Sequence, residues 1–523
     1  MFCTAQQPGG QGASHTYNTG ASPNSLYYYR NPFQVYKAVD FDSSGGWASE
    51  SSENSGSGGR WVVETSEGGA QTFEGVFLCT GHHAIPLEAH FEGLEEFQGR
   101  VLHAQRYREP QGMEGKRVLI IGIGNSALDM AVELSRVAGQ VYLSTRRGAW
   151  VGGRVGDHGL PFDVNLLTRY NDLVSKLFPS WHVNDYLENK INYRMDHELY
   201  CLKPKHHFRA QHPAINDALP NCIATGAIVV KDDVKRFAKD NSVEFVDGSI
   251  ESEVDVVILA TGYTFRFPFL EPETLIPIKD NSVSLYKWVF PPDMPRGTLA
   301  VLGLVQPIGS LAPMSELQSR WAARLVAGRG RPLPSKEEME ADIQRKKEEM
   351  RRRYFASARH TLQVDFIAYL DELAQQVGCR PAVYSTMFSD PALFLRLFFG
   401  PNVPYVYRMR GPHSWAGARE AILGVQERVL APLRTRPLAV PLSWEKRWGF
   451  YGFGAVMLAR PGVYLGLCAL FAFGYAQLVA SSQSRASDGG SSAAFFLWSF
   501  LFLTLMTALV NWFNLHFDFT AIF

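Results

Sequence analysis

Apolar and polar residues follow two successive patterns near the middle of this chain. Residues 118–121 read Val-Leu-Ile-Ile, a short and largely β-branched apolar run. From Leu128 to Leu134 the apolar side chains recur at the spacing of an amphipathic helix. The two patterns meet at Gly122-Ile-Gly124. The sequence therefore predicts a buried parallel strand, a tight turn and a helix, which is the start of a βαβ unit.

The turn matches the dinucleotide-binding pattern G-x-G-x-x-A at residues 122–127. In this pattern the first glycine makes the turn, the second admits a pyrophosphate close to the backbone, and the alanine permits close helix–strand packing. The free N–H groups of the helix N-terminus would bind phosphate. Asp129 lies in the first helical turn and is equally a candidate for the helix dipole. The predicted cofactor-binding residues here are Gly122, Gly124, Asn125, Ser126, Ala127, Leu128 and Asp129.

A second strand is predicted at residues 141–144, and it leads to Arg146 and Arg147. These arginines stand roughly 20 residues past the glycine turn, where such a unit reads the ribose 2′ position. An acidic residue would favour NAD, whereas guanidinium groups make paired hydrogen bonds to the 2′-phosphate of NADP. An ordinary basic surface loop is the alternative, and we favour NADP(H).

The two ends of the chain differ in opposite ways from this middle part. The first 25 residues are polar and lack the apolar stretch of a signal peptide, so residues 1–30 are expected to be a disordered tail. Residues 461–480 and 493–512 carry no charged side chain, over about 20 positions each, the length that spans a bilayer. We expect membrane helices there and membrane lipid as a partner. One span with an interfacial helix, or a buried helix pair, are the alternatives.

Composition narrows the functional classes. The 523 residues include 51 Lys and Arg against 51 Asp and Glu, so no nucleic-acid partner is indicated, and the length suggests two or three domains. The six cysteines form no C-x-x-C pair, which predicts a reducing compartment and neither a zinc site nor a redox dithiol. The adjacent histidines His82-His83 and His206-His207, with His212, lack the i, i+4 spacing of helical metal ligands, so no metal is expected. No catalytic acid–base pair stands out, and the catalytic residues and oligomeric state stay unknown.

Residues 97–107 read F-x-G-x-x-x-H-x-x-x-Y, a pattern to which physical reasoning alone assigns no chemistry. It resembles the identifying motif of the flavin-containing monooxygenases, also called dimethylaniline monooxygenases. C-T-G-H-H at 79–83 and A-T-G-Y at 260–263 are similar to that family's two domain-crossing segments. R-R-G-A-W at 146–150 and K-P-K-H at 203–206 most resemble the vertebrate branch numbered five. The resemblance extends from about residue 33 to the C-terminus.

This resemblance implies an α/β fold with two Rossmann-like nucleotide-binding domains, a helical insertion and C-terminal membrane helices. An FAD domain would cover residues 31–103 and resume at 263–440. An NADP-binding domain would cover 104–262, with the helical insertion at 148–221, and the membrane anchor would cover 441–523. The expected location is the endoplasmic reticulum membrane, with both nucleotide domains in the cytosol.

The resemblance also implies an enzyme with FAD and NADP(H) as cofactors. NADPH would reduce FAD, and O2 would then form a C4a-hydroperoxyflavin. A small lipophilic xenobiotic, an amine, a sulfide or a ketone, would take up one oxygen atom. The cofactor carries this chemistry while the protein orients the reactants and excludes water. A flavin disulfide reductase is disfavoured because no cysteine pair is present.

The chain departs from the family pattern at its start. Family members open with a strand and a G-x-G-x-x-G loop that holds the FAD pyrophosphate, and residues 1–30 do not resemble that region. We therefore expect an incomplete first domain, as in a truncated chain, which puts FAD binding in doubt. The alternative function is a catalytically inactive NADP-binding membrane protein.

Overall fold

The computed structural model describes residues 35–41, 60–65, 69–294, 296–355, 357 and 360–436. The chain divides into two compact units, Met1–Gly153 with Pro179–Arg380, and Arg154–Phe178 with Pro381–Phe523. The predicted tail at 1–30 and the apolar segments at 461–480 and 493–512 lie outside the described residues. Among the helices that are described, none combines the length and the apolar character needed to cross a membrane.

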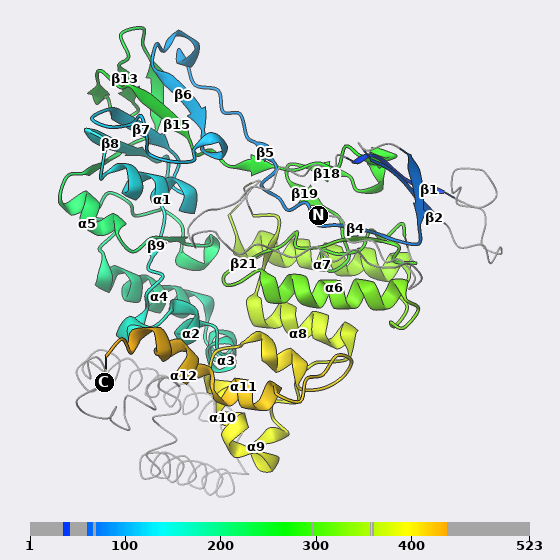
Figure 1. Cartoon of the computed structure of the whole chain (residues 1–523). Helices are drawn as coiled ribbons and strands as arrows, with labels where there is room; N and C mark the ends of the chain where they lie inside the picture. Colours follow the sequence, from blue (N-terminus) through cyan, green and yellow to red (C-terminus); the bar gives the residue numbers. More distant parts are fainter. Residues whose placement is uncertain are drawn as a thin grey trace, which may run out of the picture. The chain divides into compact units, whose positions relative to one another are not determined.

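A five-stranded parallel sheet organises one half of the first unit, in the order β11-β8-β7-β15-β6 (Figure 1). Every neighbouring pair is parallel, with Val118 of β7 opposite Val141 of β8 and Val256 of β15. From β7 the chain moves outward through β8 and β11 and then returns to β15 on the other side of β7. The strand order thus reverses between β7 and β15. The strands are β6 (Arg100–His103), β7 (Arg117–Ile121), β8 (Gln140–Ser144), β11 (Ile228–Lys231) and β15 (Val256–Leu259).

Layers on both faces explain the continuous apolar runs in these strands. Val118, Ile120 and Ile258 are fully buried in a cluster with side chains of α1 (Asn125–Leu134) and α5 (Leu219–Ala224). On the opposite face, Leu119 and Val257 pack in a cluster with the antiparallel strands β12 (Val234–Phe237) and β13 (Val243–Phe245). Figure 1 shows α1 and β13 on opposite sides of the sheet. A strand covered on both faces must be apolar at successive positions.

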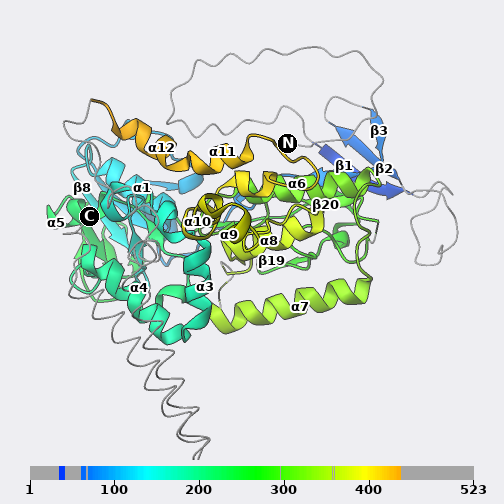
Figure 2. The ribbon, with the colours of Figure 1, turned by 90° about the horizontal axis from the view of Figure 1, so that it is seen from below.

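The other half of the first unit combines small sheets with three long helices. β1 (Val35–Phe41), β2 (Arg60–Thr65) and β3 (Ala70–Phe73) form an antiparallel meander, and β4 (Val76–Leu78) pairs in parallel with β20 (Leu299–Val301). Trp61 and Leu78 are fully buried in its core. Figures 1 and 2 show the helices running alongside one another. They are α6 (Ala312–Val326), α7 (Lys336–Arg353) and α8 (Phe366–Val377).

The second unit is helical where it is described. Tyr170 of α3 packs against Phe399 of α10, with ring centroids 5.4 Å apart. Asn402 donates a backbone hydrogen bond to Leu167, which also ties the two segments of this unit together. Its helices are α2 (Phe162–Leu166), α3 (Arg169–Leu177), α9 (Thr386–Ser389), α10 (Pro391–Phe399), α11 (Ala418–Leu423) and α12 (Val425–Leu430).

The region predicted as a helical insertion, residues 148–221, is not helical throughout. It contains α4 (Ser180–Arg194) but also the parallel strands β9 (Val151–Gly152) and β10 (Ala214–Ile215). Its residues 154–178 belong to the second unit, because α3 packs on α10. β6 likewise joins the parallel sheet although it precedes residue 104, the expected start of that domain. Where the domains divide remains a prediction.

Candidate functional site

Three loops meet at the carboxyl edge of the parallel sheet. The Gly122 N–H donates to the Ser144 carbonyl over 3.0 Å, and the Ala260 N–H donates to the Ile121 carbonyl over 2.9 Å. The loops that follow β7, β8 and β15 are therefore adjacent, at the place where the strand order reverses. Open α/β sheets bind their ligands in the crevice at such a point.

The two glycines of the turn have separate physical reasons. Gly122 has φ +128°, and a Cβ there would lie 2.4 Å from the Ala260 carbonyl oxygen. A side chain is therefore excluded by backbone on the neighbouring strand. Gly124 is exposed, and a Cβ on it would meet nothing within 4 Å. It is the N-cap of α1 with no side-chain cap, so the approach to the first helical turn is open. This cradle fits a pyrophosphate.

Of the residues after Gly124, Ser126 is open to a ligand, whereas Ala127 and Leu128 are buried in the core. Ser126 is exposed in the first turn, whose backbone N–H groups lack intrahelical acceptors. Ala127 is fully buried against the sheet, as its small size predicts. Leu128 is also fully buried, and its N–H donates to the Gly124 carbonyl over 3.1 Å. Of the predicted set, Leu128 has the least to offer a ligand.

Asn125 and Asp129 hold a neighbouring segment in place. The Ile215 N–H donates to Asn125 Oδ1 over 2.8 Å, and Asn216 Nδ2 donates to Asp129 Oδ1 over 3.0 Å. Asn216 Oδ1 in turn accepts the N–H groups of Ala218 and Leu219 at 2.9 and 2.8 Å, at the start of α5. These contacts attach β10 to the first turns of α1. Sequence reasoning missed Asn216, although an Asn shortly before a Leu-Pro helix start is a local capping signal.

Arg146 and Arg147 are exposed at the same edge of the sheet. Thr145 fixes their turn: its N–H donates to the Lys231 carbonyl at 3.0 Å, and its Oγ1 accepts the Gly148 N–H at 3.1 Å. The Arg147 guanidinium carbon lies 5.6 Å from the Phe355 ring centroid. Burial raises the pKa of Asp233, and the charge of Arg146 opposes that rise. The arginine pair thus lies in the loop that follows β8, the strand next to the glycine turn.

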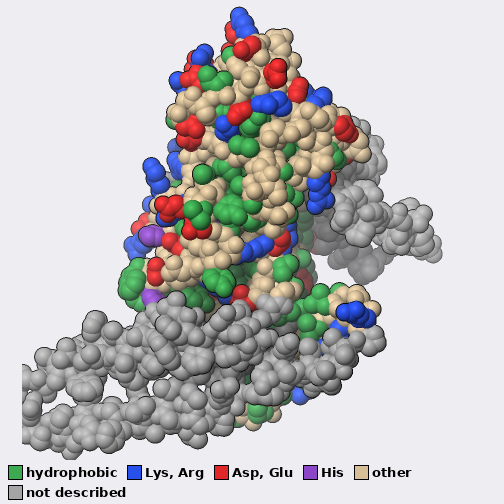
Figure 3. Space-filling view, turned by 90° about the vertical axis from the view of Figure 1, so that its left-hand side faces the viewer, with side chains coloured by type: hydrophobic (Ala, Val, Ile, Leu, Met, Phe, Trp, Pro, Cys, Tyr) green, Lys and Arg blue, Asp and Glu red, His purple; other side chains and the backbone are tan. Residues whose placement is uncertain are grey.

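Charge elsewhere on this side of the molecule is mixed. Figure 3 shows acidic and basic side chains interspersed on the face that carries β13 and α5. On the β12–β13 hairpin, for example, Arg236 Nε lies 2.6 Å from Glu244 Oε2.

The motif at residues 97–107 is a set of structural contacts around this edge. Phe97 packs against Phe237 with ring centroids 5.5 Å apart, and a Cβ on Gly99 would lie 2.5 Å from the Asp255 carbonyl oxygen. His103 Nε2 lies 3.1 Å from the Gly262 carbonyl oxygen. The Tyr107 hydroxyl donates to Glu133 of α1 over 2.7 Å. The motif thereby joins β6, the end of β15 and α1.

The predicted domain-crossing segments lie against each other. β5 (Ile85–Pro86) pairs antiparallel with β16 (Tyr263–Thr264). The ring centroids of His82 and His83 are 4.2 Å apart, and His83 lies 5.0 Å from Tyr263. Burial, then the neighbouring His83, lowers the pKa of His82 to about 4, so this ring is neutral at physiological pH. Within the described ranges, no group of three or more His, Cys, Asp or Glu could hold a metal ion.

A second carboxyl edge lies at the end of β4 and β20. Gly81 (φ +70°) follows β4, and Gly303 (φ +77°) follows β20. The loop after Gly303 leads to α6, whose first residue, Ala312, is exposed and whose N-cap Leu311 makes no side-chain cap. Parallel strands followed by glycine turns and an open helix end fit a bound cofactor. Across the described residues, however, the pyrophosphate turn of 122–127 has no counterpart at this edge.

Fold and site together define a nucleotide-binding α/β protein. The family model described as flavin-binding monooxygenase-like matches residues 19–458, and the chain belongs to this family. It is 48% identical to human flavin-containing monooxygenase 5 over 407 residues, which cover 77% of this chain and 73% of that protein. It is 44% identical to rabbit dimethylaniline monooxygenase [N-oxide-forming] 2 over 413 residues, 77% of this chain and 76% of that one. The predicted family and its vertebrate type are confirmed, and by this membership the chain is an enzyme.

A solved structure of S-allyl-L-cysteine S-oxygenase from Allium sativum is also similar. The identity is 24% and the TM-score 0.45, over 75% of this chain and 71% of that one.

Proposed function

We propose that this protein is an NADPH- and FAD-dependent monooxygenase that transfers oxygen to small lipophilic amines, sulfides or ketones. Membership of the flavin-binding monooxygenase-like family supports the reaction class. The observation that carries the nucleotide half of the proposal is the open, uncapped start of α1 beside Arg146 and Arg147.

The residues of the parallel sheet edge would hold NADP(H). The first turn of α1, from Gly124 to Ala127, presents backbone N–H groups to the pyrophosphate, and Gly122 keeps that turn close to β15. Arg146 and Arg147 bind the 2′-phosphate. Asn125 and Asp129 act indirectly, because they hold β10 beside the same turn.

The second edge would hold the flavin end of FAD. Gly81 and Gly303 leave room for a ring system to approach the backbone, and the positive end of the α6 dipole lies at the exposed first residue of that helix, Ala312. Nicotinamide supplies a hydride and flavin supplies the chemistry with O2 when they are bound. The protein's part is to orient both cofactors and to exclude water.

The domain organisation and location follow the family expectation. We propose an FAD domain at 31–103 and 263–440, an NADP domain at 104–262 and an anchor at 441–523, with the boundary before residue 104 moved to residue 100 so that β6 belongs to the NADP domain. The uncharged stretches of 461–480 and 493–512 support attachment to a membrane. By the family expectation we place the protein at the endoplasmic reticulum membrane, with the nucleotide domains in the cytosol.

A second candidate is an NADP-binding protein without oxygenase activity. It is considered because residues 122–127 carry a G-x-G-x-x-A fingerprint that suits NADP(H), a feature that a monooxygenase and a protein that only binds NADP would share. Flavin content decides between the two. Full-length protein purified in detergent and incubated with FAD should show bound flavin absorbance, and a sulfide substrate should accelerate NADPH consumption and yield its S-oxide. Protein that binds NADP⁺ but retains no flavin would support the second candidate.

A further inference from the structure

A buried chain of hydrogen bonds reaches the second edge from the interior of the helical layer. The Gly303 N–H donates to Gln318 Oε1 over 2.7 Å, and Gln318 Nε2 donates to the Tyr369 hydroxyl over 2.7 Å. That hydroxyl donates to the Lys287 carbonyl over 2.6 Å. Gln318 is fully buried, and Tyr369 and Lys287 are 3% and 6% exposed. Each donor in the chain thus meets one acceptor, in a single direction.

The hydrogen-bond chain ends at Lys287, which lies in a strained turn. Lys287 and Trp288 have φ +50° and +54°, a left-handed conformation that non-glycine residues rarely adopt. Two consecutive residues in this region persist only where their surroundings fix them. Trp288 packs edge-on against Tyr369, with ring centroids 5.7 Å apart. The Lys287 carbonyl is thereby aimed at the Tyr369 hydroxyl.

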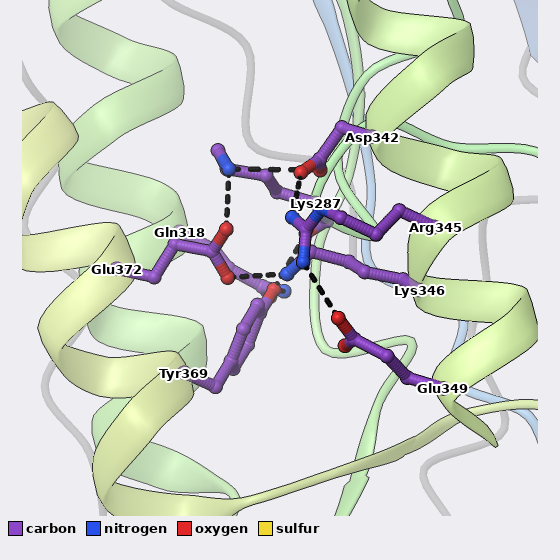
Figure 4. A network of polar contacts seen from close by, with 8 residues as sticks. All are labelled: Lys287, Gln318, Asp342, Arg345, Lys346, Glu349, Tyr369 and Glu372. Carbon is purple, nitrogen blue, oxygen red and sulfur yellow. Dashed lines mark hydrogen bonds and ion pairs between the residues drawn. The ribbon is translucent and has the colours of Figure 1, made fainter. Parts of the chain in front are cut away.

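Ion pairs between α7, α8 and the turn hold the Lys287 side chain. Figure 4 shows Glu372 between the ammonium groups of Lys287 and Lys346, with Asp342 on the other side of Lys287. Lys287 Nζ lies 3.6 Å from Asp342 Oδ2. The Lys346 ammonium also lies 5.0 Å from the Trp288 ring centroid. The turn is therefore fastened from both helices.

The hydrogen-bond chain starts at the Gly303 N–H, where a loop begins. Leu302 continues β20 by donating its N–H to the Leu78 carbonyl over 2.8 Å, and Gly303 then turns the backbone away. Farther along, the Gln306 N–H donates to the Leu362 carbonyl over 2.7 Å, and β21 (Gln306–Pro307) pairs with β22 (Gln363–Val364). The segment from Gly303 to the start of α6 is thus anchored at two points, of which Gln318 is the first.

We propose that Gln318 and Tyr369 are positioning residues that fix the loop of residues 303–311 for flavin binding. This inference rests on the proposed function, which places the flavin at this edge. Apolar side chains would pack these helices equally well, so packing alone does not require the polar groups. A buried polar network is tolerated only when all of its groups are hydrogen-bonded, as they are here. What the polar chain adds is a defined position for the Gly303 amide.

Tyr369→Phe and Gln318→Met test this role at constant volume. The first removes both hydrogen bonds of the hydroxyl, and the second removes the acceptor of the Gly303 N–H. In full-length protein without flavin, amide hydrogen exchange across residues 303–311 should accelerate in both variants and stay unchanged across 122–134. The FAD dissociation constant should rise about tenfold, as expected for one buried hydrogen bond, while that for NADP⁺ stays at the wild-type value.

Tyr407→Phe is the matched control, because this tyrosine is also buried and its hydroxyl accepts from Asn402 over 3.1 Å in the second unit. It should leave FAD affinity unchanged. Wild-type FAD affinity in Tyr369→Phe and Gln318→Met, or an equal loss in Tyr407→Phe, would overturn the positioning role. A wild-type chain that binds no FAD would instead refute the proposed function, and the exchange rates at 303–311 would still decide whether Gln318 anchors the loop.

Discussion

Individual residues at the parallel sheet edge make the most direct prediction about cofactor choice. Changing both Arg146 and Arg147 to Ala should weaken NADP⁺ binding by about ten- to a hundredfold, since hydrogen bonds to charged groups contribute roughly 1.5–3 kcal/mol. NAD⁺ has no 2′-phosphate, so its affinity should be unchanged. Titration calorimetry with both nucleotides measures the difference.

Arg136→Ala is the matched control for this pair. Arg136 is equally exposed but follows the carboxyl end of α1, away from the glycine turn. Its replacement should leave both affinities at wild-type values. If the double variant lost affinity for NADP⁺ and for NAD⁺ to the same extent, the arginines would not bind the 2′-phosphate.

For individual residues, the sequence predicted the roles that local backbone geometry determines and missed the side-chain contacts that depend on residues far along the chain. Gly122 is required by a close backbone approach, and the fingerprint alone indicated this. Asn125 was predicted as a cofactor ligand, yet its side-chain oxygen accepts from Ile215, 90 residues farther along the chain. No spacing rule for a βαβ unit contains that partner.

Among the helices, α7 likewise combines features that its own sequence determines with a contact that depends on a distant segment. Its bounds, Lys336–Arg353, coincide with the charged run in the sequence, because Ser335 and Glu338 form a capping box at its start. Its alternating charges are typical of a solvated helix face, and most of its charged side chains are exposed or half-buried. Lys346 is different, since it pairs with Glu372 of α8. That contact depends on helix packing, which charge alternation along one segment does not encode.

The ion pairs between α7 and α8 predict a pH-dependent stability. Burial alone would raise the pKa of Glu372, but Lys346 and Lys287 outweigh it and hold that pKa below its ordinary value. A carboxyl group with a lowered folded pKa stabilises the protein above its unfolded pKa, about 4.3, and loses that contribution as the pH falls below it. Glu372→Gln should therefore lower the free energy of unfolding at pH 7 by about 3 kcal/mol, the lower end of the cost of breaking a buried pair, because the half-buried Lys346 loses its carboxylate while Lys287 keeps Asp342 at 3.6 Å.

Urea denaturation of wild type and Glu372→Gln at pH 7 and at pH 4 measures this effect. The difference between the two proteins should shrink at the lower pH. Glu349→Gln is the control: its carboxylate pairs with Arg345 at 2.9 Å, but its side chain is 62% exposed, so its loss should cost about 1 kcal/mol or less. A constant difference between wild type and Glu372→Gln across this pH range would contradict the assigned charge state.

For the whole molecule, the parallel sheet was predictable and the division into units was not. Buried apolar runs and turn residues identify β7, β8 and α1 one after another along the chain. The second unit instead joins residues 154–178 to residues beyond 380, through contacts such as Tyr170 with Phe399. Such pairing between distant segments leaves no periodic trace in the sequence.

The last prediction concerns the attachment of the whole chain to a membrane. Residues 461–480 are free of charge over the length of a bilayer core, so a charge at their centre should oppose insertion by roughly 2.5–3.5 kcal/mol. Leu470→Arg should therefore reduce the fraction of full-length protein that floats with phosphatidylcholine vesicles. Ser487→Arg, in the polar segment between the two apolar stretches, adds the same charge and should float like wild type. NADP⁺ affinity should match the wild type in both variants, because the arginine pair and glycine turn lie in the first unit. Equal flotation of Leu470→Arg and wild type would show that this stretch does not enter the bilayer.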